Sequence, residues 1–360
     1  MEDKIKYLLN TVNEPYLKKG FTDLGFVYEI SLNGDKLTLR LGISDTEYND
    51  FPGLKTRIAV PIVEGIPEIQ SVVVDFMLGV VNHDNKQKAL ILPKVKNTIA
   101  IASGKGGVGK STVAANLAAS LTLEGAKVGL IDADIYGPSI PIMLGANGRP
   151  GIVKIGDKNK MLPIVQYNIK LMSIGFLIED NSAVIWRGPM ASSALKQFMT
   201  EVEWEDLDYL LFDMPPGTGD IQLTLSQTVP LTGSVVVTTP QEIAVADARK
   251  GHLMFEKVNV TNLGFIENMS YYLKADGEKE YIFGQGGGKR IAEEFGVKLL
   301  GEIPIDTNVR IAGDSGKPIV ISNPESEVSK IFKTIAKNLI LEINERNISP
   351  EKYSGPEIIL

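Results

Sequence analysis

The segment SGKGGVGKST (103–112) limits the possible folds of this chain more than any other part of the sequence. It satisfies the phosphate-loop pattern G-x-x-x-x-G-K-[ST] through Gly104, Gly109, Lys110 and Ser111. An apolar, strand-like run lies before the loop and a helix-like stretch follows it, which is the order that this motif requires. We therefore expect an α/β fold with a nucleotide bound at this turn.

Each part of the loop has an expected task in binding ATP. Glycines let backbone N–H groups approach phosphate oxygens, and the N-terminus of the following helix adds a positive partial charge. Lys110 is expected to reach the β- and γ-phosphates, the Ser111 hydroxyl to ligate Mg²⁺, and Thr112 to assist at the α-phosphate. The loop residues expected to contact the nucleotide are Gly104, Lys105, Gly106, Gly107, Val108, Gly109, Lys110, Ser111 and Thr112.

Short apolar runs alternate with helical patterns from residue 97 onward. Runs this continuously apolar are typical of strands buried on both faces of a parallel sheet. The expected strands are 98–103, 127–132, 208–215, 234–240, 262–268 and 298–304, and the clearest helices are 110–124 and 243–257. Residues 97–345 are thus predicted to form a doubly wound, mostly parallel sheet.

The segment 329–343 carries an apolar stripe at helical spacing, and we expect it to pack back on that sheet. A membrane-bound amphipathic helix is the alternative, which the weakly basic polar face disfavours.

Acidic residues follow two of the expected strands. Asp132 and Asp134 lie at the carboxyl end of the run 127–132, and Asp213 lies near the end of the run 208–215. Ligands bind at the carboxyl ends of parallel strands, so these side chains should converge on the phosphates. One is expected to hold Mg²⁺ through water and another to orient the attacking water.

Residues 1–90 have the pattern of a small α+β domain ahead of the loop. Ile5, Leu8, Leu9 and Val12 recur at helical spacing. Asn33-Gly34, between two alternating runs, predicts a hairpin, because both residues tolerate positive φ. A further strand is expected at 71–78, a linker or a surface loop at 82–88, and a loose tail at 346–360.

Composition narrows the chemistry by exclusion. The net charge of −7 argues against nucleic-acid partners. No apolar run approaches the roughly 18 residues of a membrane span and no signal peptide is visible, so we expect a cytoplasmic protein. Cysteine is absent, which removes disulfides, thiolate nucleophiles and sulfur ligands, and His83 and His252 alone cannot build a zinc site.

The motifs together resemble the deviant P-loop ATPases that include MinD, ParA, the arsenite-transport ATPase and the nitrogenase iron protein. In that group Lys105 would be the signature lysine, which reaches the phosphates bound by the partner subunit. The resemblance therefore implies a homodimer in which Lys105 acts in trans, as an arginine finger does.

The resemblance narrows to the Mrp/ApbC family of iron–sulfur cluster carriers and covers nearly all of 97–345. The matching blocks are DADIYGPSIPIMLG, IWRGPMASSALKQF, DMPPGTGDIQLTLSQ, VVTTPQEIAVADARKG, GFIENMSYY and IFGQGGGKRIAEEFGVKLLGEIPID. Asn268 corresponds to the asparagine that contacts the adenine edge. The segment NTVNEPYLKKGFTDLGFV is similar, more loosely, to the small iron–sulfur assembly domain often fused ahead of this family.

The chain departs from that family at the cluster ligands. A CxxC motif should follow ENMSY, but Lys274, Ala275 and Asp276 stand there instead. The segment ISDTEYNDFPGLK of the small domain also lacks its reactive cysteine. Asp276 and Glu278 offer oxygen ligands, whereas sulfide-bridged iron is held by thiolates. Asp276-Gly277 is therefore expected to be a plain turn.

Three functions remain open from the sequence. The first is an ATP-hydrolysing iron–sulfur carrier or assembly factor that delivers clusters to apoproteins through an ATP-gated homodimer, in a variant without cysteine ligands of its own. Its implied partners are scaffold and client apoproteins, and its expected ligands are ATP and Mg²⁺, whereas a cluster of its own is not expected without cysteine. The second is a MinD/ParA-like regulatory switch with no metal role. The third, a metabolic enzyme of the dethiobiotin-synthetase kind, is the weakest, because the blocks belong to the carrier family.

Overall fold

The computed structural model describes residues 1–134, 137–177 and 188–349, and it divides into two compact units. One unit comprises residues 1–82 together with the chain from Ile340 onward; the other comprises residues 83–339. The sequence-based boundaries were 1–90, 97–345 and 346–360, so the division falls earlier and the last helix contributes to both units. Residues 350–360 of the expected tail lie outside the described residues.

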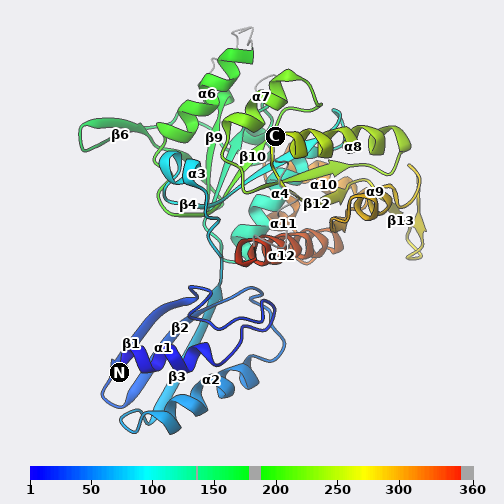
Figure 1. Ribbon diagram of the computed structural model, residues 1–360. Helices are drawn as coiled ribbons and strands as arrows, with labels where there is room; N and C mark the ends of the chain where they lie inside the picture. The colour runs from blue at the N-terminus through cyan, green and yellow to red at the C-terminus, as the bar shows by residue number, and fades with distance from the viewer. Residues whose placement is uncertain (135–136, 178–187, 350–360) are drawn as a thin grey trace, which may run out of the picture. The chain divides into compact units, whose positions relative to one another are not determined.

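The first unit is a three-stranded sheet with one helix ahead of its first strand and another between its second and third strands in sequence (Figure 1). Its elements are α1 (Glu2–Asn10), β1 (Val27–Asn33), β2 (Lys36–Ile43), α2 (Phe51–Gly65) and β3 (Ser71–Leu78). β1 and β2 are antiparallel, joined where Gly34 adopts φ 63°, and β3 runs parallel to β2. Alternate residues of β2, from Leu37 to Ile43, are fully buried, so one face of the sheet forms the core. This unit is the predicted small α+β domain.

The last helix, α12 (Glu327–Ile348), makes different contacts along its length. In its first half, Ile335 packs so closely over Gly301 that a Cβ atom there would lie 2.5 Å from the Ile335 Cγ1 atom. This half packs on the sheet as predicted. Further along, the Asn344 Nδ2 atom donates a hydrogen bond to the Gly79 carbonyl (2.9 Å), and its Oδ1 atom accepts one from Val81 N–H (2.9 Å). Those last turns belong to the first unit.

The second unit is built on an eight-stranded sheet of order β15-β12-β11-β4-β10-β5-β9-β8 (Figure 1). All neighbours are parallel except β8 and β9. The strands are β4 (Val95–Ser103), β5 (Val128–Asp132), β8 (Ile164–Gln166), β9 (Ile169–Ser173), β10 (Leu207–Asp213), β11 (Gly233–Thr238), β12 (Asn262–Glu267) and β15 (Leu299–Glu302). Two hairpins project from it: β6 (Ile152–Ile155) with β7 (Lys158–Met161), and β13 (Tyr272–Leu273) with β14 (Lys279–Glu280).

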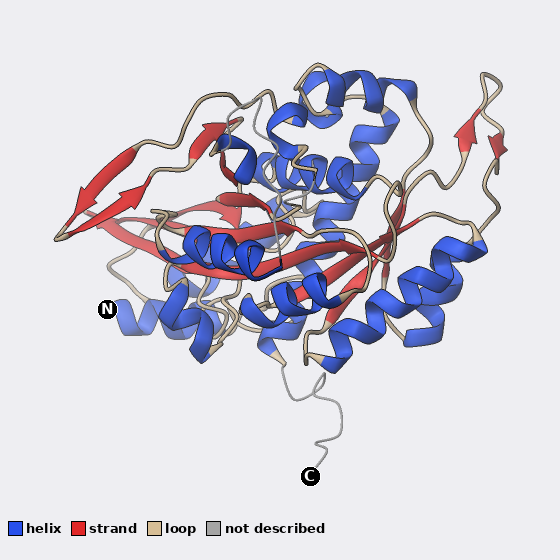
Figure 2. Cartoon of the chain, turned by 90° about the horizontal axis from the view of Figure 1, so that it is seen from above, coloured by secondary structure: helices blue, strands red, loops and turns tan. Residues whose placement is uncertain are grey.

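Helices cover both faces of this sheet (Figure 2). They are α3 (Lys86–Ile91), α4 (Lys110–Leu123), α5 (Ile140–Met143), the 3₁₀ turn η1 (Ile174–Phe176), α6 (Gly188–Thr200), α7 (Asp220–Thr228), α8 (Glu242–Lys257), α9 (Gly287–Phe295), α10 (Thr307–Asp314) and α11 (Ile319–Ser322). The prediction of a doubly wound, mostly parallel sheet is confirmed. The polar stretch 82–88 is only partly a loop, because Asn85 caps α3 through Lys88 N–H (3.0 Å).

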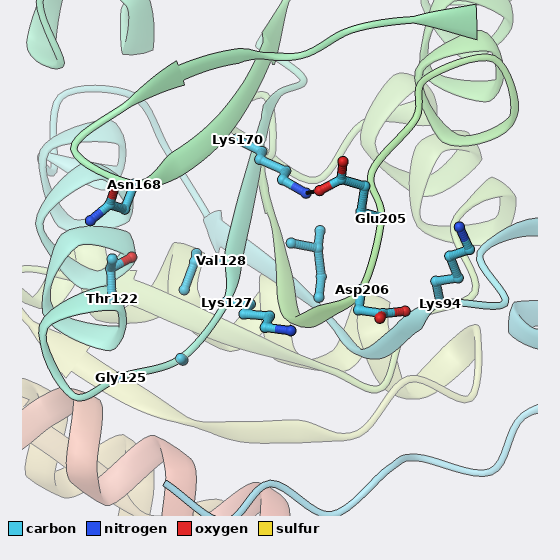
Figure 3. A pocket seen from close by; sticks show the side chains of 11 residues that line it. Lys94, Thr122, Gly125, Lys127, Val128, Asn168, Lys170, Glu205 and Asp206 are labelled. Carbon is cyan, nitrogen blue, oxygen red and sulfur yellow. Dashed lines mark hydrogen bonds and ion pairs between the residues drawn. The ribbon is translucent and has the colours of Figure 1, made fainter. Parts of the chain in front are cut away.

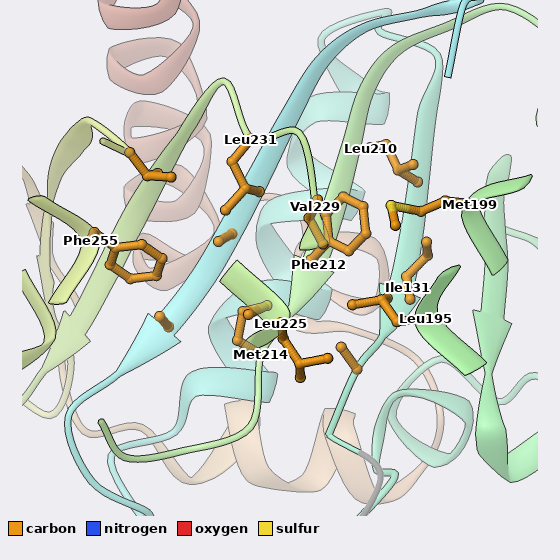
Figure 4. Close-up of a cluster of buried hydrophobic side chains, with 14 of the residues drawn as sticks. Ile131, Leu195, Met199, Leu210, Phe212, Met214, Leu225, Val229, Leu231 and Phe255 are labelled. Carbon is orange, nitrogen blue, oxygen red and sulfur yellow. The ribbon is translucent and has the colours of Figure 1, made fainter. Parts of the chain in front are cut away.

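One large core joins β10 to the helices on one face of the sheet (Figure 4). Phe212 of β10 is fully buried and belongs to the same cluster as Leu225 of α7, Leu195 of α6 and Phe255 of α8. Each such side chain contributes about 1.5–3 kcal/mol by leaving water. This packing fixes the end of β10, which carries Asp213. No helix within the described ranges combines the length and the apolarity needed to cross a bilayer.

Candidate nucleotide-binding site

The phosphate loop joins β4 to α4 and depends on glycine at several positions. Gly107 and Gly109 both have φ 82°, a left-handed conformation that side chains disfavour. At Gly104 a Cβ atom would lie 2.1 Å from the Asp247 carbonyl carbon of α8, so only glycine fits there. Lys110 begins the 14-residue helix α4, whose N-terminus therefore faces the loop. The backbone is shaped to surround an anion.

The predicted catalytic residues meet at the carboxyl edge of the sheet. Asp213 and Asp132 are register partners on the neighbouring strands β10 and β5, and both are fully buried. The Lys110 Nζ atom lies 2.6 Å from Asp213 Oδ1 and 3.6 Å from Asp134 Oδ2. The structure thus places one ammonium group among three carboxyl groups.

The burial and charges of this cluster favour the binding of a further cation. Burial raises the pKa of Asp132 well above its ordinary value, with the Asp213 charge adding to the effect. Burial also raises the pKa of Asp134 and that of Asp213, while the Lys110 ammonium opposes both shifts. The three carboxyl groups exceed the single ammonium, so a bound cation would favour their ionised forms.

The donor set fits Mg²⁺ of the kind held mainly by substrate phosphates and water. Asp213 Oδ2 is buried and accepts no hydrogen bond from the described residues, and the Ser111 hydroxyl lies 3.2 Å from Lys110 Nζ. Within the described ranges no three His, Cys, Asp or Glu side chains are grouped as a metal site. A P-loop site needs only one or two protein ligands for Mg²⁺, so the oxygens of Asp213 and Ser111 suffice for such a site.

A cleft of about 500 Å³ opens beside the loop and has the size of a nucleoside site. Its lining includes Gly109 and Thr112 of the phosphate loop and Asn268. The Asn268 Nδ2 atom donates a hydrogen bond to the Val108 carbonyl (2.8 Å), which ties it to the loop. The remaining lining residues are Ser139, Ile142, Met143, Met269, Pro304, Ile305, Asp306, Val309, Arg310, Gly313, Asp314 and Phe332.

Two residues at or near the site, Asp306 and Ser173, were not predicted from the sequence. Asp306 lies four residues beyond the end of β15, whereas Asp213 is the last residue of β10, so the strand-end rule did not select Asp306. Its Oδ1 atom accepts a hydrogen bond from Asn308 N–H (2.7 Å), which caps α10. Ser173 was also missed: its hydroxyl lies 3.2 Å from Asp132 Oδ2 and helps to hold that carboxyl group.

Lys105 stands apart from the carboxyl cluster. Its side chain is half-buried and makes no ion pair within the part of the chain that the structure describes. Ser103 Oγ donates a hydrogen bond to the Lys105 carbonyl (2.9 Å), so the backbone is fixed while the ammonium is not. The structure therefore does not bring Lys105 to the carboxyl cluster with Lys110.

A second cleft, of about 680 Å³, lies at the opposite edge of the sheet (Figure 3). Lys127 precedes β5 there, and the Lys170 Nζ atom pairs with Glu205 Oε2 at 2.6 Å. Because parallel α/β sheets bind their ligands at the carboxyl edge, this amino-edge cleft is not the nucleotide site.

The hairpin β13–β14 occupies the place of the expected cluster ligands. Asp276 and Gly277 form its turn, in which Asp276 Oδ1 accepts a hydrogen bond from Glu278 N–H (2.9 Å) and Gly277 has φ 87°. The Lys274 Nζ atom lies 3.5 Å from Glu278 Oε2. These side chains are engaged in a turn, as expected. Residues 135–136 and 178–187, which belong to two of the quoted blocks, lie outside the described residues.

The chain is similar to known P-loop NTPases and to iron–sulfur cluster carrier proteins. The family model described as ParA: NUBPL iron-transfer P-loop NTPase matches residues 94–340. An iron–sulfur cluster carrier protein of Escherichia coli K12 is 44% identical over 337 residues, which cover 93% of this chain and 90% of that protein. One of Synechocystis is 42% identical over 346 residues, covering 94% and 96%.

Two solved structures are each similar to 68% of this chain. A nucleotide-binding protein of Archaeoglobus fulgidus, in complex with ADP, is 37% identical with a TM-score of 0.58, covering 68% of this chain and 94% of that one. The MinD cell division ATPase of Pyrococcus furiosus is 24% identical with a TM-score of 0.51, covering 68% and 98%, and shares the fold.

The fold and the site together define a nucleotide-binding P-loop NTPase. Within that class, the chain belongs to the NUBPL iron-transfer P-loop NTPase family.

Proposed function

We propose that this protein is an ATP-hydrolysing factor that delivers iron–sulfur clusters to apoproteins and lacks cysteine ligands of its own. The observation that carries the proposal is the buried Lys110–Asp213 pair at the phosphate loop (2.6 Å), in a chain 44% identical to a named iron–sulfur cluster carrier. A cytoplasmic location stays a prediction.

Nucleotide binding would use the loop and the neighbouring cleft. ATP phosphates would take the place of Asp213 beside Lys110, while Asn268 and the cleft would receive the base. Ser111 and Asp213 are the residues that would hold Mg²⁺, directly or through water. When bound, Mg²⁺ supplies positive charge that neutralises the phosphates during phosphoryl transfer.

The environments of the carboxyl groups separate their roles in hydrolysis. The Asp132 carboxyl group already accepts three hydrogen bonds, from Asp134 N–H, Ile140 N–H and Ser173 Oγ. Asp134 has a side chain that is 15% exposed, so water can reach it. We therefore assign the orientation of the attacking water to Asp134, and a supporting role to Asp132.

Cluster handling would have to use thiolates from outside this chain. The sequence has no cysteine, and the hairpin 272–280 offers only exposed carboxylates near the expected ligand position. Hard oxygen ligands hold sulfide-bridged iron poorly. A scaffold or client protein would supply the cysteines, while an ATP-gated homodimer, with Lys105 acting across the interface, would control contact between them.

The isolated protein is expected to bind no stable cluster. After anaerobic incubation with iron, sulfide and a reducing thiol, then desalting, iron and acid-labile sulfide should remain far below the protein concentration. The matched control is the double variant Leu273→Cys, Asp276→Cys, which restores a CxxC spacing on the exposed hairpin and should retain brown colour. A chelator-resistant cluster in the unmodified protein would contradict the proposal.

The second candidate is a MinD/ParA-like switch without a metal role, favoured by the missing cysteines. Its support from comparison is the fold alone, because the Pyrococcus MinD is 24% identical. Transfer of a cluster between other proteins, accelerated by this chain with ATP, separates the two candidates.

A further inference from the structure

Buried polar groups without a hydrogen-bond partner among the described residues lie at both ends of one loop beside the nucleotide site. The loop 214–219 has Asp213 at one end, with its free buried Oδ2 atom, and α7 at the other. In the first turn of α7, Gln222 is only 2% exposed, and neither its Nε2 nor its Oε1 atom has a hydrogen bond within the described part of the chain. Buried amide groups without partners are rare in native structures and call for an explanation.

The helical spacing of α7 shows where the Gln222 side chain lies. Leu225, Ser226 and Val229 follow it at three, four and seven positions, and all three are buried. Gln222 therefore lies on the inward face of the helix. Since α7 follows the carboxyl end of β10, its first turn is at the edge of the sheet that carries the phosphate loop.

The loop between these groups contacts the phosphate loop and has open space at two of its glycines. Gly217 N–H donates a hydrogen bond to the Ser103 carbonyl (3.0 Å), and Pro216 Cγ lies 4.0 Å from the place of a Cβ atom on Gly106. Around Gly217 and Gly219, no atom lies within 4 Å of an added Cβ position. The structure therefore leaves open space beside the loop at both glycines.

We propose that Gln222 is a positioning residue for hydrolysis, whose amide pairs with the backbone of loop 214–219 only when ATP is bound. One side-chain amide offers both a donor and an acceptor, which matches the N–H and C=O groups of a loop peptide. Pairing would hold the loop, and with it Asp213, against the phosphates. The inference rests on the proposed ATPase function.

The test compares Gln222→Leu with wild type and with Ser226→Ala, one turn further along the same face. Removing an unmet polar group leaves the thermal midpoint without nucleotide unchanged or raises it. We expect KM for ATP within about threefold of wild type and kcat lowered at least about tenfold, because a contact made only in the reacting state is lost. The rise of the midpoint with a slowly hydrolysed ATP analogue should also be smaller than in wild type. Ser226→Ala, whose hydroxyl bonds the Gln222 carbonyl (2.8 Å), should keep wild-type kcat.

Two results would overturn the inference. An unchanged kcat in Gln222→Leu would make Gln222 a passive buried group. A large fall of the nucleotide-free midpoint in both Gln222→Leu and Gln222→Met would show that the amide is already paired without ATP. Absence of turnover in the wild-type protein would instead reject the ATPase function itself.

Discussion

Lys110→Ala is expected to abolish measurable ATP binding, raising Kd at least about a hundredfold, or about 2.8 kcal/mol. In the described structure the Lys110 Nζ atom is the cation in contact with Asp213 and Asp134. Without it, the ATP phosphates would meet carboxyl groups that no ammonium offsets. Titration calorimetry with Mg-ATP measures the loss directly.

The fold of the variant should survive. Burial already raises the pKa of Asp213, so this carboxyl group can take up a proton when its counter-charge is removed. Circular dichroism should therefore match wild type, while the thermal midpoint should no longer rise with ATP. Wild-type affinity in a folded Lys110→Ala protein would reject the site assignment.

Lys105→Ala is expected to leave ATP affinity within about threefold of wild type but to lower turnover at least about a hundredfold, as loss of an arginine finger does. The Lys105 side chain makes no ion pair among the described residues, whereas Lys110 is bound to the carboxyl cluster. In the proposed homodimer, its charge would stabilise the transition state in the partner subunit. Steady-state hydrolysis and sedimentation with ATP measure the two effects.

Lys127→Ala is the matched control for charge removal. Lys127 lines the cleft at the opposite edge of the sheet, so its loss should change neither binding nor turnover (Figure 3). Equal loss of ATP affinity in Lys105→Ala and Lys110→Ala would contradict the action of Lys105 across the dimer.

The sequence predicted the large sheet well because its strands are apolar on both faces. The runs 208–215 and 262–268 differ from β10 and β12 by at most two residues at either end. The helix α2 was not predicted, because it carries Pro61 in its interior, which interrupts the usual helical signal. The extension of α12 into the first unit was missed, because its contacts through Asn344 join residues far apart in sequence.

The residues of the site also fall into those that the sequence predicted and those that it could not predict. Lys110, Asp132 and Asp213 could be selected from the sequence, because the loop and strand-end rules are local. The cleft beside Asn268 could not, since it is assembled from segments around 139–143, 268–269 and 304–314. Nor could the unmet amide of Gln222, because burial and the lack of a partner are properties of the packed structure alone.

The most direct test of the account is an anaerobic transfer assay with a cluster-loaded scaffold protein and a cysteine-ligated apo-acceptor. The rise of the acceptor's visible circular dichroism is followed with this protein, with and without Mg-ATP, and with Lys110→Ala in its place. The account predicts that ATP and the wild-type protein together accelerate transfer, while Lys110→Ala has no effect. Equal transfer rates in all three mixtures, alongside normal ATP hydrolysis by the wild type, would contradict it and leave the metal-free switch.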